Sequence, residues 1–197
     1  AVSECFVSSF YHNVWPIVDG ADPRLIKDTL LMHHYIGSKT LVAEVDGTVR
    51  GILVGLCPMD LAALGRSLAA ATKMLYRLTT GRYRLNPLAK KHLYQSYWSS
   101  LAYVYRHPSS RAETLLLASQ KEYRGGIGRA LMDAWLAEVR SSGFPNATVG
   151  TDSTVSWDFY ERYGYRRVRE FDFDGYKYSL PAEKVKGYIY FIDLGQK

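Results

Sequence analysis

Cysteine is scarce in this chain, since Cys5 and Cys57 are the only two among 197 residues. Two thiols are too few for the disulfide framework of a small secreted protein and suit a reducing compartment, so a cytoplasmic protein is expected. Long apolar runs are also missing: no stretch approaches about 18 uncharged apolar residues. The opening residues lack the basic start and apolar run of a signal peptide. The sequence therefore predicts neither a membrane span nor a membrane partner.

Extreme composition and internal repeats are absent as well. Apolar residues make up 47% and charged residues 22%, which argues against wholesale disorder, collagen and coiled coil. This length suits a single domain, residues 1–197, with one buried core. The net charge of +6 admits a polyanionic partner, but the 16 tyrosines are scattered and form no aromatic and basic block of an RNA-binding module. Nucleic acid is therefore not the expected partner.

The first half of the chain predicts helices, a hairpin and more helices. Apolar spacing predicts a helix over Ser3 to Trp15, and Asp22-Pro23 is a favourable start for a second helix. Two apolar runs around Asp46-Gly47 predict a β-hairpin. Residues 59–106 are rich in Ala, Leu, Lys and Arg and predict a helical insertion, interrupted near residues 79–81 and 86–87.

The insertion carries the positive excess of the chain. Between Met59 and Ser100 a single acid, Asp60, stands against seven basic residues: Arg66, Lys73, Arg77, Arg82, Arg84, Lys90 and Lys91. The simpler interpretation is a solvated helical face, and a dedicated anion site is the alternative.

A strand, a glycine-rich turn and a helix follow one another further along the chain. Glu113 to Ser119 is a short apolar run, and the helix over Gly126 to Arg140 carries an apolar stripe. Free amides at a helix start, its positive dipole end and glycines without side chains suit a bound phosphate over Gly126 to Arg129. The turn is not a Walker loop, because no Gly-Lys-Ser/Thr follows, and it lacks the full G-x-G-x-x-G.

A second segment makes the first more specific. Residues 122–131 read Glu-Tyr-Arg-Gly-Gly-Ile-Gly-Arg-Ala-Leu, and residues 159–165 read Phe-Tyr-Glu-Arg-Tyr-Gly-Tyr. The pair resembles the two signature segments of the GNAT superfamily of acetyl-CoA-dependent N-acyltransferases, over about Leu115 to Val168. The resemblance implies an α/β (α+β mixed) fold with a bent mixed sheet and helices on both faces. It also implies that two parallel strands, Glu113 to Ser119 and Ala147 to Thr151, splay apart to admit the pantetheine arm of the cofactor.

The resemblance implies acetyl-CoA as co-substrate, held mainly by backbone groups. The positions that correspond to its pantetheine and pyrophosphate contacts are Leu117, Ala118 and Ser119, then Arg124, Gly125, Gly126, Ile127, Gly128, Arg129 and Ala130. Ser153 or Ser156 could bond the cofactor tail. Tyr123 stands where the family usually has Arg or Gln, and Arg124 lies one position later.

Tyr160 occupies the place of the family's tyrosine that faces the cofactor sulfur. A phenol, with an ordinary pKa of about 10, can donate a proton to the departing thiolate. The competing interpretation is a core tyrosine packed with Val155 and Phe159. The general base is left open: the candidates by position are Glu113, Asp152, Glu44 and His107. For Glu113 and Asp152 the simpler interpretations are a solvated strand-end acid and a helix cap.

The leading hypothesis is direct acetyl transfer from acetyl-CoA to a primary amine, without a covalent enzyme intermediate or a metal. No Cys and His spacing resembles a zinc site, and His33 and His34 are expected to flank a helix surface. If the basic insertion lines the acceptor entrance, neutral or acidic amines are favoured over polycations. The alternatives are a non-catalytic CoA-binding or regulatory module and, less favoured, a nucleic-acid-binding protein.

Overall fold

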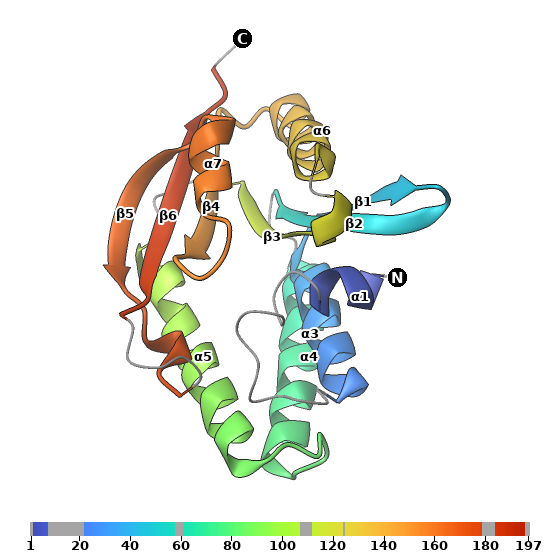
Figure 1. Ribbon diagram of the computed structural model, residues 1–197, viewed down its shortest axis with the longest axis vertical. Coiled ribbons are helices and arrows are strands. Elements are labelled where there is room, and N and C mark those ends of the chain that lie inside the picture. The colour runs from blue at the N-terminus through green and yellow to red at the C-terminus, as the bar shows by residue number, and fades with distance from the viewer. Residues whose placement is uncertain are drawn as a thin grey trace.

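A computed structural model describes residues 2–7, 22–57, 61–106, 112–123, 125–178 and 184–195. Six strands form one mixed sheet in the order β1-β2-β3-β4-β6-β5 (Figure 1). The strands are β1 (Lys39–Val45), β2 (Thr48–Leu56), β3 (Glu113–Ser119), β4 (Asn146–Asp152), β5 (Arg166–Asp172) and β6 (Lys186–Asp193). Neighbouring strands are antiparallel except β3 and β4, which are parallel. The mixed α/β fold class expected from the sequence is confirmed.

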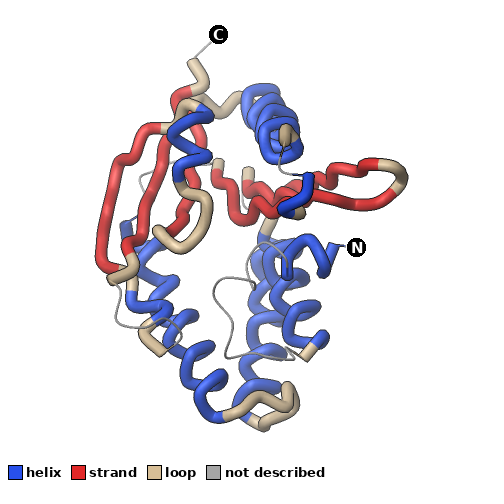
Figure 2. Tube along the Cα trace, viewed as in Figure 1, coloured by secondary structure: helices blue, strands red, loops and turns tan. Residues whose placement is uncertain are grey.

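Helices cover both faces of the sheet. The α-helices are α1 (Val2–Phe6), α3 (Pro23–Ile36), α4 (Leu61–Thr79), α5 (Pro87–Arg106), α6 (Ile127–Ser141) and α7 (Asp158–Tyr163). Two short 3₁₀ turns, η3 (Lys121–Tyr123) and η4 (Asp174–Tyr176), accompany them. Figure 2 shows α6 on one side of β1, β2 and β3, with α1 and α3 on the other. Most of the first predicted helix lies outside the described residues. No described helix is both long and apolar enough to cross a membrane.

The hairpin of β1 and β2 forms where the sequence predicts it. Asp46 and Gly47 both have positive φ, +52° and +70°, which is the backbone form that a two-residue hairpin turn requires. β2 continues into the core with Leu53 and Val54 fully buried. The hairpin thus supplies one half of the sheet from residues that are adjacent in sequence.

The predicted insertion forms two helices, and the break between them lies where the sequence pattern predicts it. α4 ends at Thr79, and α5 begins at Pro87 after Asn86, whose side chain accepts the Ala89 N–H at 2.7 Å. α4 packs along α3, where the buried carboxylate of Asp28 accepts hydrogen bonds from Tyr83 and Arg77. Figure 1 shows α5 leaving the linker at an angle to α4 and reaching the region of β6. One helix of the insertion therefore supports α3, and the other approaches the sheet.

The main core lies between α6 and the sheet. Leu131, Met132, Trp135 and Val139 of α6 are buried, as the apolar stripe predicts. The indole of Trp135 lies over β2 at Gly55, where an added Cβ would come within 2.5 Å of the ring. A glycine at this position is therefore a packing requirement, and it fixes how closely α6 approaches the strands.

The parallel pair β3 and β4 stays together for only two residue pairs, Glu113 with Thr148 and Thr114 with Val149. Beyond them β3 continues along β2 to Ser119, whereas β4 continues along β6 to Asp152. The two strands therefore diverge toward their carboxyl ends. This is the splay that the family resemblance implies, and it creates the opening described next.

Candidate active site

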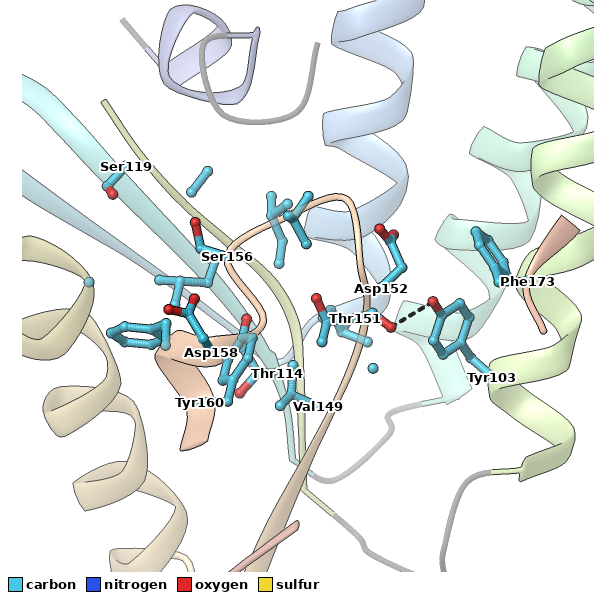
Figure 3. A pocket seen from close by; sticks show the side chains of 18 of the residues that line it. Tyr103, Thr114, Ser119, Val149, Thr151, Asp152, Ser156, Asp158, Tyr160 and Phe173 are labelled. Carbon is cyan, nitrogen blue, oxygen red and sulfur yellow. Dashed lines mark hydrogen bonds between the residues drawn. The ribbon is translucent and has the colours of Figure 1, made fainter. Parts of the chain in front are cut away.

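A cavity of about 480 Å³ lies where β3 and β4 separate (Figure 3). Residues 114–119 of β3 and 149–152 of β4 form two of its sides. The loop after β4 and α7 form another side, and α5 with the segment around η4 closes the remaining one. The lining thus combines segments that are far apart in sequence.

One end of the cavity meets the amino terminus of α6. Gly126 precedes the helix with φ +113°, a left-handed conformation that favours glycine. The first helical hydrogen bond there runs from the Ala130 N–H to the Gly126 carbonyl at 2.9 Å, so the amides of Ile127, Gly128 and Arg129 precede the bonded ladder. In the part of the chain that the structure describes, no side-chain hydrogen bond caps this end. The arrangement suits an anion, as the glycine turn predicts.

The predicted cofactor positions occupy different surroundings. Gly128 lines the cavity, and a Cβ added there would lie 3.5 Å from the ring of Phe159. Gly125, Gly126, Arg129 and Ala130 are exposed beside it, while Ile127 packs against the core. Leu117, Ala118 and Ser119 line the cavity on the stretch of β3 that no longer pairs with β4. Arg124 lies outside the described residues.

Tyr160 lies at the base of the cavity on α7. Its side chain is 8% exposed, and its ring centroid lies 5.8 Å from that of Tyr190 and 5.9 Å from that of Tyr165. Burial raises the pKa of the Tyr160 phenol, so the group is neutral at physiological pH. Within the described part of the chain its hydroxyl has no hydrogen-bond partner. The ring is therefore packed in the core while the residue still lines the cavity (Figure 3).

Asp152 ends β4 at the opposite side of the opening. Its carboxylate is 8% exposed and lines the cavity. It accepts hydrogen bonds from the Thr154 N–H at 2.8 Å, from the Thr154 hydroxyl, and from the Tyr176 hydroxyl at 3.1 Å. Burial raises the pKa of Asp152, and these hydrogen bonds only partly oppose that rise. Asp152 does not cap a helix, since α7 begins only at Asp158. It holds the turn after β4 through Thr154 and is a buried carboxylate facing the cavity.

None of the other residues that the sequence suggested as a base is among the described residues that line the cavity. Glu113 lies where β3 still pairs with β4, and it is not among the lining residues. Glu44 is exposed on β1 in the hairpin and is likewise absent from the lining. His107 lies outside the described residues. Because the strands separate only after Thr114, the beginning of β3 lies at the closed end of the splay.

The two serines predicted for the cofactor tail separate. Ser153 accepts the Lys186 N–H at 3.1 Å and thereby joins the end of β4 to β6, and it does not line the cavity. Ser156 is exposed and lines the cavity. Only Ser156 therefore stays in reach of a ligand there.

The sequence interpretation missed the wall that the insertion supplies. Ser96, Ser100 and Tyr103 of α5 line the cavity, and their spacing of four and three places them on one helix face. The Tyr103 hydroxyl donates to the Thr151 carbonyl at 2.8 Å, drawn as a dashed line in Figure 3. Its ring packs edge-on against Phe171. The helical spacing of these three residues was visible in the sequence. Nothing in the sequence indicated that this face of α5 would lie against the sheet.

The charge of the lining differs from the sequence expectation. None of the seven basic residues from Arg66 to Lys91 is among the lining residues. The charged side chains that do line the cavity are Asp152, Asp158 and Arg162, and Arg162 forms an ion pair with Asp158. The premise for a neutral or acidic acceptor is therefore not met by the described lining.

Among the described residues there is also no group of three His, Cys, Asp or Glu placed to hold a metal.

Comparison with known proteins gives similarity at the level of the fold. No family model matches the sequence, and no curated protein matches it. An agmatine N-acetyltransferase, solved as a point mutant in its apo form, superposes with a TM-score of 0.55 at 16% identity, covering 97% of this chain and 92% of that one. The chain has the GNAT fold.

Two further structures support the GNAT fold. Ard1 from Thermoplasma volcanium has a TM-score of 0.52 at 16% identity and covers 100% of this chain and 95% of its own. The polyamine N-acetyltransferase of Drosophila melanogaster has a TM-score of 0.52 at 16% identity and covers 98% of this chain and 95% of its own. The similarity of fold therefore extends over nearly the whole chain and not only over the two sequence segments.

Proposed function

We propose that this protein is an acetyl-CoA-dependent N-acetyltransferase that acts on a small primary amine. The observation that carries the proposal is the parting of β3 from β4 beside Tyr160, with the amino terminus of α6 at one end and the Asp152 carboxylate at the other. A non-catalytic CoA-binding module would need the opening and the helix terminus but not a buried carboxylate opposite the phenol.

Backbone groups are the proposed cofactor contacts. The amides at the start of α6 would hold the pyrophosphate, because the glycine turn leaves them uncovered. The stretch of β3 at Leu117, Ala118 and Ser119 would bond the pantetheine arm along the edge that β4 leaves. The cofactor supplies an acetyl group as a thioester, and the protein positions it beside the amine.

Asp152 and Tyr160 are the proposed acid–base pair. An alkylammonium must lose a proton before its nitrogen can attack, and the Asp152 carboxylate would accept that proton. The nitrogen forms a bond to the acetyl carbonyl carbon as the carbon–sulfur bond breaks. The neutral Tyr160 phenol would then donate a hydrogen bond or its proton to the departing sulfur, since burial keeps it protonated.

The acceptor proposed from the lining is a small amine with one cationic group. Asp152 is the lining carboxylate that no described cation pairs with, whereas Asp158 is paired with Arg162. Tyr103, Phe173 and Tyr176 offer aromatic surface on the same side. A compact monoamine with an apolar body fits this surface better than a polyamine or an anionic amine, which replaces the expectation of a neutral or acidic acceptor.

An amine panel tests the proposal. We expect release of CoA thiol from acetyl-CoA to be fastest, as kcat/KM, with a monoamine such as 2-phenylethylamine, slower with agmatine and spermidine, and slowest with glutamate. If glutamate were the best acceptor, the basic insertion would line the entrance after all. If CoA bound with no amine accelerating thiol release, the non-catalytic module would replace the enzyme.

Replacing Gly128 by aspartate is expected to weaken CoA binding at least tenfold in calorimetry. The added carboxylate would stand at the amino terminus of α6 and compete there with the pyrophosphate for the same amides. Gly128→Ala is the matched control, because its Cβ would make an ordinary 3.5 Å contact with Phe159. Equal CoA affinity in a folded Gly128→Asp variant would remove α6 from the cofactor site.

A further inference from the structure

Helix α4 turns a largely apolar face to solvent. This α4 face comprises seven exposed residues: Leu61, Gly65, Leu68, Ala69, Thr72, Leu75 and Tyr76. The three leucines are spaced seven residues apart, and 59% of Leu68 and 53% of Leu75 are exposed. The small residues between them, among which Thr72 alone carries a polar group, leave the leucines prominent along the length of the helix.

The opposite side of α4 is already used inside the protein. Ala63, Ser67, Met74 and Leu78 are buried, and the helix packs along α3. A helix that is apolar on both sides is normally covered on both sides. Four of the seven large apolar side chains exposed among the described residues lie on α4, namely Leu61, Leu68, Leu75 and Tyr76. The concentration is larger than scattered surface residues would give.

Cations border the α4 face. Arg66 and Lys73 are exposed along one edge, and neither has an ion-pair partner among the described residues. Arg82 lies over the ring of Tyr76 at 5.3 Å, at the end of the same face. The sequence of residues 61–106 contains no Asp or Glu at all. The surface that covers this face must therefore be mainly apolar in the middle and tolerate or attract positive charge at its border.

A second copy of the chain that pairs antiparallel through this face meets this requirement poorly. When two α4 faces pair antiparallel about a twofold axis, the basic edges fall on the same side, so that Arg66 of one copy lies opposite Lys73 of the other. Four cations would then gather without a described acid between them. Nucleic acid would satisfy the cations but not the leucines. An anionic lipid surface offers acyl chains for the leucines and headgroup charge for the cations.

We propose that the α4 face docks the protein on an anionic phospholipid surface. The 19 residues of α4 span about 28 Å, and the helix would lie in the plane of the interface with Leu68 and Leu75 among the acyl chains. Tyr76 is an aromatic residue of the kind that favours the headgroup region. This replaces the sequence expectation of no membrane partner and does not depend on the proposed acetyl transfer.

Sedimentation with vesicles tests the docking. We expect the protein to pellet with phosphatidylcholine vesicles that contain phosphatidylserine and to stay in the supernatant with phosphatidylcholine alone. The double variant Leu68→Ser/Leu75→Ser should lose binding at least tenfold, because both side chains would leave the acyl region. Val42→Ser is the matched control: Val42 is 48% exposed, but it lies on β1 away from α4.

The cations are tested separately. Arg66→Gln and Lys73→Gln should each weaken binding about fivefold, whereas Arg169→Gln, an exposed position on β5, should change it little. Circular dichroism and acetyl-transfer rates without vesicles should be unchanged in all variants. Equal binding to neutral vesicles, or no binding to either kind, would overturn the proposal. A dimer in light scattering that the leucine substitutions dissociate would make a second copy the occupant instead.

Discussion

Asp152→Asn is expected to lower kcat for acetyl transfer by about 10²- to 10⁴-fold, the range typical of a lost general base. Asparagine retains an acceptor oxygen for the Thr154 N–H and nearly the same volume, so the end of β4 should stay in place. Steady-state kinetics with the best amine of the panel measures the effect. The variant should still bind CoA, because the proposed cofactor contacts lie on α6 and β3.

Glu113→Gln is the matched control for this experiment. It removes the same charge from the other strand-end acid, which lies at the paired end of β3 and does not line the cavity. Its kcat should match that of the unsubstituted protein. If Glu113→Gln were the damaging change and Asp152→Asn the harmless one, the base would have to be sought at the closed end of the splay.

The pH dependence provides a second readout for Asp152. Burial raises its pKa above the ordinary carboxyl value, so activity should rise with pH through that raised pKa as the carboxylate forms. Asp152→Asn should remove this acid limb and leave a low, flatter profile. An acid limb that persists unchanged in the variant would assign it to another group.

Stability should move in the opposite direction to activity. A carboxyl whose pKa is raised by folding binds its proton more tightly in the native protein than in the unfolded chain. The stability that it contributes is present below the unfolded pKa and is lost as pH rises through the native pKa. At neutral pH the buried charge therefore opposes folding, and Asp152→Asn should melt at the same or a higher temperature. A clear drop in melting temperature would indicate that Asp152 is mainly structural, through its hydrogen bonds to Thr154 and Tyr176.

Tyr160→Phe is expected to reduce kcat by about 10²- to 10⁴-fold while CoA affinity stays within a factor of a few. Only the phenolic hydroxyl is removed, and the ring can still pack against Tyr165 and Tyr190. Calorimetry gives the CoA affinity, and single-turnover kinetics gives the transfer step. Since burial keeps this phenol protonated well above neutrality, Tyr160 should add no alkaline limb near physiological pH.

Tyr165→Phe provides the comparison for Tyr160. Tyr165 is a buried neighbour with its ring centroid 5.9 Å from that of Tyr160, but it is not among the lining residues. Both substitutions remove one buried hydroxyl, and only Tyr160→Phe should lower turnover strongly. Similar small losses in both variants would return Tyr160 to a packing role.

The features that the sequence determined by itself are those made by neighbouring residues. Asp46-Gly47 specifies the hairpin turn because both positions adopt positive φ without needing any distant contact. Gly126 likewise adopts a positive φ without a distant contact, and it thereby specifies the helix terminus that follows it. The two family segments follow one another closely along the chain. Their resemblance was therefore enough to predict both the splayed strands and the place of Tyr160.

Only the tertiary structure decided which groups share the cavity. Glu113 and Asp152 were both candidates for the base by position. They are distinguished by the point at which β3 and β4 stop pairing, which no local pattern encodes. Tyr103 and Thr151 are 48 residues apart in sequence. They meet because α5 diverges from α4 and approaches the sheet. The α4 face is exposed because α3 packs against the opposite side of the helix. Burial of one helix face depends on what packs against it, so periodicity alone could not say which apolar stripe remains uncovered.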